Sequence, residues 1–284
     1  MKISHSFLLF TTIAIGACST NNQRTDIGSM SQPLSAKQVV ARHIAATGGE
    51  RNYATMRNIY IETEVVEPDF TVTGPYYAHR DGRMRVDIFM DGKRVFSEGI
   101  DETGGWQQGG EGAPVKTIGE DGNAALYRGL IQNIYGFYGA AERDQTITLA
   151  GRQTIDGVDY YVLKSVDADG FEQNYFINPE NWLIERRRET SALHPDLDPT
   201  KTASEKTYSD FQEFCGLKKA TKTRTVDLLS GNETQNTRIL NYRCNLSDDE
   251  LRSREMIRRK NVRRSFSRSP PYNPALSAKS VDFG

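Results

Sequence analysis

The first half of the chain alternates between apolar and polar residues in short stretches, a pattern typical of β-strands with one buried face. In the stretch 59–65, Ile59, Ile61 and Val65 fall on one face, and the carboxylates of Glu62 and Glu64 fall on the other. We therefore expect a strand here with one face in a core and the other in water.

The same alternation continues over 83–90, where Met84, Val86 and Ile88 share one face. Asp-Gly pairs bound this stretch at 81–82 and 91–92, and such pairs favour tight hairpin turns. A further strand is expected over 93–100. The first half thus predicts an antiparallel meander with one apolar and one hydrated face.

A helix is expected before the first strand. Ser35 is a suitable N-cap, apolar residues recur at helical spacing after it, and Gly48 and Gly49 end the pattern. His43 lies within this helix, and we expect it to pack on the helix face rather than to act as a ligand.

A second helix is predicted to interrupt the meander over 123–138. It has too little polar surface to lie on the outside of a water-soluble domain. Gly129 and Gly136 weaken it by about 1 kcal/mol each relative to alanine. The apolar face of the sheet is the expected place for it. One apolar stripe holds Leu126, Leu130, Ile134 and Phe137, and a second holds Tyr127, Ile131, Tyr135 and Tyr138.

The second half returns to strand patterns separated by turn residues. A loop rich in Pro and Asp is expected over 191–201, and the last hairpin is expected to turn near Gly231. The predicted strands cover 147–152, 158–166, 171–177, 182–188, 205–214, 218–228 and 234–244.

The N-terminus has the layout of an export signal: Lys2, then a short apolar run over 7–15, then small residues. The run is shorter than the roughly 20 residues that span a bilayer. The segment Ile15–Cys18 resembles a bacterial lipobox, which implies cleavage before Cys18 and acylation of its thiol and amine. An ordinary signal that happens to carry a cysteine is the alternative. In enterobacteria-like systems, Ser19 after the cysteine resembles an outer-membrane address.

The two ends of the mature chain differ in composition from its centre. Residues 18–34 hold little to bury and are expected to form a flexible, lipid-anchored tether after the signal peptide 1–17. Residues 253–284 are basic and predicted to be disordered. This tail could contact anionic lipid or lipopolysaccharide, at roughly 1 kcal/mol per charge; the alternative is a solvated tail without a partner.

Overall charge and known motifs narrow the classes of function. The chain has 284 residues and a formal net charge of −1, which argues against a nucleic-acid binder. The sequence lacks the common zinc-protease, serine-hydrolase, phosphate-loop and Cys-x-x-Cys motifs. Its four histidines are scattered. We therefore expect no cofactor or metal, and an enzyme is the least supported class.

The cysteines other than Cys18 form an even pair, Cys215 and Cys244. If the last hairpin turns near Gly231, Cys244 lies opposite about Lys218, and Cys215 is only a few residues further along. An exported protein meets an oxidising compartment, so a disulfide between them is expected. A reactive thiol is the alternative, although neither cysteine has a histidine nearby in the sequence.

The order of these segments over about 35–251 resembles the LolA/LolB lipoprotein-carrier family in its broad outer-membrane lipoprotein-sorting branch. The resemblance rests on Ala46–Gly49 after the first helix and on an Asp101…Trp106 element before a helix rich in Tyr and Leu. It continues through Gly151…Leu163, Tyr208…Leu217 and Asn245–Asp249.

The resemblance implies a mainly β domain over 35–252, with helices added. Its fold would be an incomplete antiparallel β-barrel, a half-barrel of about eleven strands, with helices plugging the concave face. It also implies that acyl chains occupy the concavity when the helices move aside. On the strands and the helix, the expected lipid-binding residues are Met84, Val86, Ile88, Leu126, Leu130, Ile134 and Phe137.

Two non-enzymatic functions are consistent with this pattern. The first is a monomeric carrier or receptor, anchored to the outer membrane through Cys18 and facing the periplasm, which holds acyl chains of lipoproteins or lipids away from water. The second is an envelope interaction or structural protein whose groove is permanently filled by its own side chains. Apolarity alone does not separate them.

Overall fold

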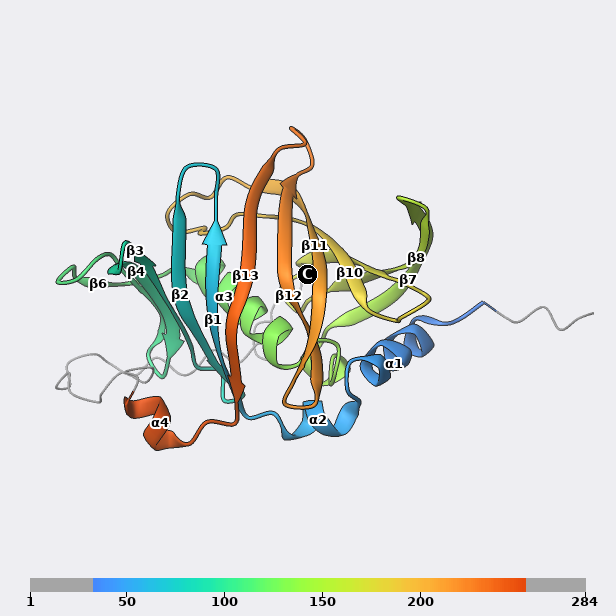
Figure 1. Ribbon diagram of the computed structural model, residues 1–284, viewed down its shortest axis with the longest axis horizontal. Coiled ribbons are helices and arrows are strands. Elements are labelled where there is room, and N and C mark those ends of the chain that lie inside the picture. The colour runs from blue at the N-terminus through green and yellow to red at the C-terminus, as the bar shows by residue number, and fades with distance from the viewer. Residues whose placement is uncertain (1–32, 254–284) are drawn as a thin grey trace, which may run out of the picture. The chain divides into compact units, whose positions relative to one another are not determined.

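The computed structural model describes residues 33–253. The predicted signal peptide, Cys18, all but the last two residues of the tether, and residues 254–284 of the basic tail lie outside the described residues. One open antiparallel sheet of thirteen strands dominates the fold, in the order β6-β5-β4-β3-β2-β1-β13-β12-β11-β10-β9-β8-β7 (Figure 1). The predicted incomplete barrel is confirmed, with two more strands than the resemblance implied.

The sheet consists of two antiparallel meanders, β1 to β6 and β7 to β13, which are joined side by side where β1 pairs with β13. Its strands are β1 (Asn58–Val66), β2 (Thr71–His79), β3 (Met84–Met90), β4 (Lys93–Asp101), β5 (Gly104–Gln108), β6 (Val115–Thr117), β7 (Thr146–Ile155), β8 (Val158–Val166), β9 (Glu172–Ile177), β10 (Ile184–Ser191), β11 (Thr202–Phe214), β12 (Leu217–Asp227) and β13 (Glu233–Cys244).

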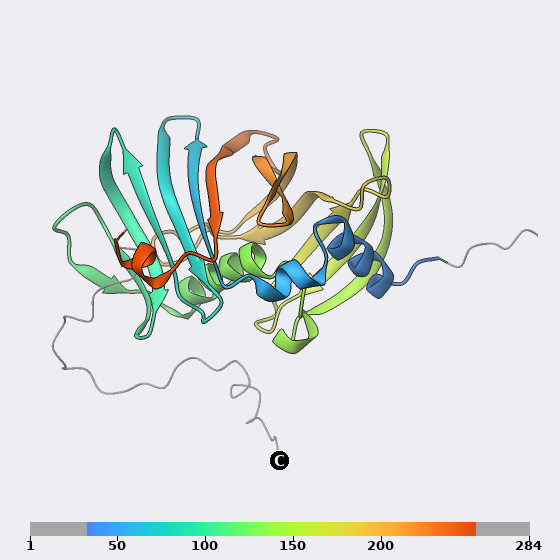
Figure 2. The same cartoon turned by 60° about the horizontal axis from the view of Figure 1, so that its bottom comes forward.

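The helices are α1 (Ala36–Ala46), α2 (Glu50–Thr55), α3 (Glu120–Ile134) and α4 (Asp248–Ser253), with a short 3-10 turn at Ala141–Arg143. Figure 2 shows α3 inside the curve of the sheet, with α1 and α2 along one end of it. One buried core cluster joins residues of α1, α2 and α3 to the concave face of the sheet. The predicted plugging of that face by helices is therefore confirmed.

The first helix begins and ends as its sequence predicts. Ser35 and Gln38 form a capping box, in which each side chain binds the other residue's backbone amide. After Ala46 the backbone turns through Gly48, at a φ of +117°. A Cβ on Gly48 would lie 2.0 Å from the Gly216 carbonyl oxygen, so only glycine permits this close approach between α1 and the β11–β12 turn.

The second predicted helix is displaced toward the N-terminus. It covers Glu120–Ile134 instead of 123–138, with Glu120 and Asp121 in its first turn, where acidic groups favour a helix. It ends because Gly136 adopts a left-handed φ of +52° and its amide bonds back to the Ile131 carbonyl. Phe137 therefore lies beyond the helix. Tyr127, in the second predicted stripe, is exposed rather than buried.

The convex face is not uniformly hydrated, contrary to the prediction for the first half. Tyr60 and Tyr77 point to this side and are buried under Leu246 and Leu251, which belong to the C-terminal segment that ends in α4. A chain segment after the last strand thus covers a face that alternation alone predicts to be wet.

The strands β2, β5 and β6 were not predicted. β2 contains Gly74 and Pro75, residues that normally weaken a strand. Here glycine is required, since a Cβ at position 74 would lie 1.9 Å from the Asp87 carbonyl oxygen of β3.

Candidate functional site

The apolar part of the concave face is built from two directions. From the sheet comes Met84, which is buried, and from the helical side come Leu130, Ile134 and Phe137, which are also buried. Leu126 is partly buried against them. We call these five residues, all predicted from the sequence, the apolar cluster.

Val86 and Ile88, the other two predicted lipid-binding residues, lie on the same face of β3 as Met84, following the strand alternation. Both are only partly buried and neither belongs to the core cluster. Val86 lies opposite Tyr76 of β2 and Glu98 of β4. The structure therefore brings five of the seven residues into one cluster and leaves two beside it.

His43 faces this part of the concavity from α1, packed edge-on against the Phe137 ring at 5.6 Å. Its Nδ1 lies 2.8 Å from the Trp182 carbonyl oxygen. Burial lowers the pKa of His43 to about 4, against the opposing effect of that hydrogen bond. His43 is a neutral packed side chain, as the sequence predicts.

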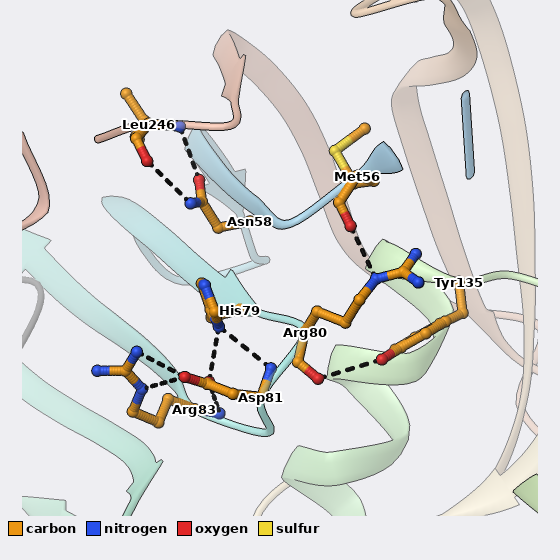
Figure 3. A network of polar contacts seen from close by, with 8 residues as sticks. All are labelled: Met56, Asn58, His79, Arg80, Asp81, Arg83, Tyr135 and Leu246. Carbon is orange, nitrogen blue, oxygen red and sulfur yellow. Dashed lines mark hydrogen bonds and ion pairs between the residues drawn. The ribbon is translucent and has the colours of Figure 1, made fainter. Parts of the chain in front are cut away.

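Arg80 links the segment after α3 to the turn between β2 and β3, and Arg143 packs on the same segment from the 3-10 turn. Arg80, at the β2–β3 turn, donates from Nε to the Met56 carbonyl at 2.8 Å, and the Tyr135 hydroxyl donates to the Arg80 carbonyl at 3.1 Å (Figure 3). The Tyr135 ring contacts two guanidinium groups, Arg80 at 4.6 Å and Arg143 at 4.5 Å. The C-terminal end of α3 is therefore held by polar contacts as well as by apolar ones.

The loop between β10 and β11 contacts the opposite wall of the half-barrel. His194 lies 3.3 Å from a Glu98 carboxylate oxygen on β4 and packs against the Phe96 ring. Hydrogen bonding to Glu98 raises the pKa of His194. Asp196 accepts a 2.7 Å hydrogen bond from the Gly119 amide, immediately before α3. The loop thus connects β10 and β11 with β4 and the start of α3.

Charged and hydrogen-bonding side chains, rather than apolar ones, lie on the concave face of β9, β10 and β11. Arg187 lies opposite Tyr175 of β9 and opposite Lys206 of β11, so the three share one row and one face. Arg187 Nε is 3.0 Å from a Glu189 carboxylate oxygen, and the Arg187 guanidinium also binds the Gln132 side chain of α3. Glu189 and Tyr208 lie two residues further along the same strands and so face the same side. We call Arg187, Lys206, Tyr208 and Glu189 the cationic row.

These residues were not predicted from the sequence. The segment Ile184–Ser191 is nearly all charged or polar, so it carries no alternation that could tell Arg187 from its neighbours. Arg186 and Arg188 point to the convex face, where both bind Glu205. Only the pleat of the sheet assigns Arg187 to the inside.

A pocket of about 230 Å³ is lined by residues of β11, β12 and β13. The ladder between β12 and β13 runs from Val226–Glu233 to Lys222–Arg238, and no further pairs follow within the described residues. The pocket occupies this gap, with Thr221 on one strand and Ile239 on the other among its lining. Beyond it, Cys215 and Cys244 are joined by a disulfide, with Cα atoms 6.5 Å apart.

Known proteins resemble this chain in fold but not in sequence. No family model matches the chain, and no curated protein matches it by sequence. A LolA superfamily protein from Nitrosomonas europaea superposes with a TM-score of 0.52 at 13% identity, covering 77% of this chain and 97% of the other.

Two further solved structures agree. An outer membrane lipoprotein-sorting protein domain from Vibrio parahaemolyticus gives a TM-score of 0.51 at 12% identity, covering 78% of this chain and 99% of the other. A DUF1329 family protein from Desulfovibrio piger gives 0.51 at 16% identity, with the same two coverages. These likenesses show that the chain has the LolA-like fold, which confirms the fold that the resemblance implied.

Two negative findings concern residues 33–253. No helix there combines the length and apolarity needed to cross a bilayer. Nor does that part of the chain bring together three His, Cys, Asp or Glu side chains able to hold a metal ion.

Proposed function

We propose that this protein is a non-enzymatic carrier or receptor that binds acyl chains of lipoproteins or lipids on the concave face of its half-barrel. One observation carries the proposal: α3 buries Leu130 and Ile134 against the concave face of a sheet that is open at both edges. An acyl chain can replace those side chains, because both remove similar apolar surface from water.

The attachment of α3 is compatible with such an exchange. Besides the apolar contacts of Ile134, its C-terminal end is held by the hydrogen bond from Tyr135 to Arg80 and by ring contacts with Arg80 and Arg143, and water can replace the hydrogen bond when the segment moves. Gly129 faces open space and only weakens the helix. The fold shared with lipoprotein-sorting proteins supports the same function.

We further propose that acyl chains on Cys18 anchor the protein to the outer membrane, with the domain as a monomer in the periplasm. Two or more acyl chains give stable attachment, whereas one gives only weak binding. Cys18→Ser should move the protein from the membrane to the soluble envelope fraction. Continued membrane attachment of this variant, with no acyl mass on Cys18 in the wild type, would contradict the anchor.

Acyl binding is tested by native mass spectrometry of protein purified without detergent, together with titration of a fluorescent fatty acid. We expect co-purifying lipid and saturable uptake of the probe. Protein that carries no lipid and takes up no acyl probe would show a closed core, and the second function, an envelope interaction or structural protein, would replace the first.

A further inference from the structure

The cationic row contains more positive than negative charge. Arg187 and Lys206 are neighbours on β10 and β11, and Glu189, two residues after Arg187, faces the same side. The Glu189 carboxylate already lies 3.0 Å from Arg187 Nε. Lys206 has no hydrogen bond or ion pair with any other residue in the described range. One positive charge of the row is therefore unmatched.

The position of Lys206 makes this charge costly to keep. Lys206 is partly accessible to water, yet the surrounding protein removes enough solvent to lower its pKa to about 8, and Arg187 lowers it further while Glu189 opposes the change. An apolar side chain of similar length would avoid this desolvation. A partner that binds only sometimes would account for a lysine here.

The row is also continuous with the apolar cluster. Tyr175, opposite Arg187, packs edge-on against the Phe137 ring at 4.9 Å. On the α3 side, Gln132 binds both Arg187 and Gln173, so movement of α3 removes a partner from Arg187. Displacing α3 would thus expose an apolar channel that ends at a cationic, hydrogen-bonding wall.

We propose that Arg187 and Lys206, assisted by the Tyr208 hydroxyl, bind the singly charged oxyanion headgroup of an acyl amphiphile whose tail replaces α3 against the apolar cluster. This inference rests on the proposed function and names the ligand chemistry. One unmatched positive charge fits one negative charge, as on a fatty-acid carboxylate or a phosphodiester. Burial raises the pKa of Tyr208, so its hydroxyl stays protonated and can donate.

The test compares two probes that differ only in headgroup charge, cis-parinaric acid and its methyl ester, at pH 7. We expect the wild type to bind the acid at least tenfold more tightly than the ester. Lys206→Met should abolish this preference while ester binding is retained. Lys164→Met is the matched control, because Lys164 lies on β8, is 40% exposed and pairs with Glu172; it should keep the preference.

Competition then separates the two headgroup sources. Oleate and 1-oleoyl lysophosphatidylglycerol, a singly charged phosphodiester, should both displace the acid probe from the wild type, and uncharged monoolein should displace it at least tenfold less well. The stronger of the two anions identifies the headgroup. Lys206→Gln provides a second variant if Lys206→Met does not fold.

Three outcomes are distinguishable. Equal affinity of the wild type for acid and ester would overturn the headgroup site and leave acyl binding intact. A preference that survives both Lys206 variants would also overturn it. Binding of neither probe by the wild type would overturn the proposed function itself, and the headgroup site with it.

Discussion

The apolar cluster and the cationic row, the two parts of the concave face, contribute to stability in opposite directions. In the apolar cluster, Leu130 and Ile134 are buried and contact other apolar side chains, so their burial stabilises the folded protein. In the cationic row, Lys206 lies among strands with its charge unmatched. The first arrangement stabilises the fold, whereas the second costs free energy that Glu189 offsets in part and that an anionic ligand would offset further.

This difference separates structural from functional use of one surface. Active and binding sites commonly retain groups that destabilise the free protein. The apolar cluster alone fits both a closed core and a lipid site. The cationic row beside it favours a ligand, because a closed core gains nothing from an unmatched lysine.

The largest expected effect is on the apolar cluster. The pair Leu130→Ala and Ile134→Ala should lower the free energy of unfolding by about 2–5 kcal/mol for each residue, since each leaves a cavity in a packed interior. Urea unfolding measures this loss. Tyr127→Ala on the exposed side of α3 is the control and should cost less than about 1 kcal/mol. Wild-type stability in the double variant would mean that α3 is not docked.

An intermediate effect is expected from pH, through His43. Its folded pKa is about 4 and its unfolded value about 6.5, so the unfolded chain binds more protons between those values. Stability should therefore be full above pH 6.5, fall by about 3 kcal/mol as the pH drops toward 4, and level off below it.

Unfolding of wild type and His43→Gln across this pH range isolates the contribution of His43. His194 gives the opposite sign: its pKa is raised in the folded state, so its contribution is present at low pH and lost as the pH rises through the folded pKa. His194→Gln should therefore change the slope in the other direction. An identical pH dependence in wild type and His43→Gln would contradict the burial of a neutral imidazole.

The smallest expected effect, a change in stability on replacing Lys206, distinguishes the cationic row from the apolar cluster most directly. Lys206→Met should raise the free energy of unfolding by about 1 kcal/mol, because it removes an unmatched charge and keeps the apolar stem. Urea unfolding at pH 7 measures the change, and Lys164→Met should stay within about 0.5 kcal/mol of wild type. A loss of stability in Lys206→Met would place the lysine among the structural residues, together with the apolar cluster.

Much of the fold could be predicted from local patterns. Alternation located β1, β3 and β4, because a period of two follows directly from the pleat, and strand patterns between turn residues located every strand from β7 to β13. Ser35 was predicted as the N-cap of α1, because N-capping is a local hydrogen-bonding device, and the structure adds the reciprocal bond from Gln38 that makes it a capping box. β2 escaped prediction because Gly74 is needed for a close approach to Asp87, a contact between strands that local sequence does not show.

By itself, the sequence determined where strands and helices form, that α3 needs an apolar surface, and that Cys215 and Cys244 come near one another. Only the tertiary structure decided which face each charged strand residue occupies. Arg186, Arg187 and Arg188 are chemically alike, yet the pleat and the register with β9 and β11 place Arg187 alone on the concave face beside Lys206. Such a pairing depends on contacts between strands, and the electrostatics of the candidate site arise from it.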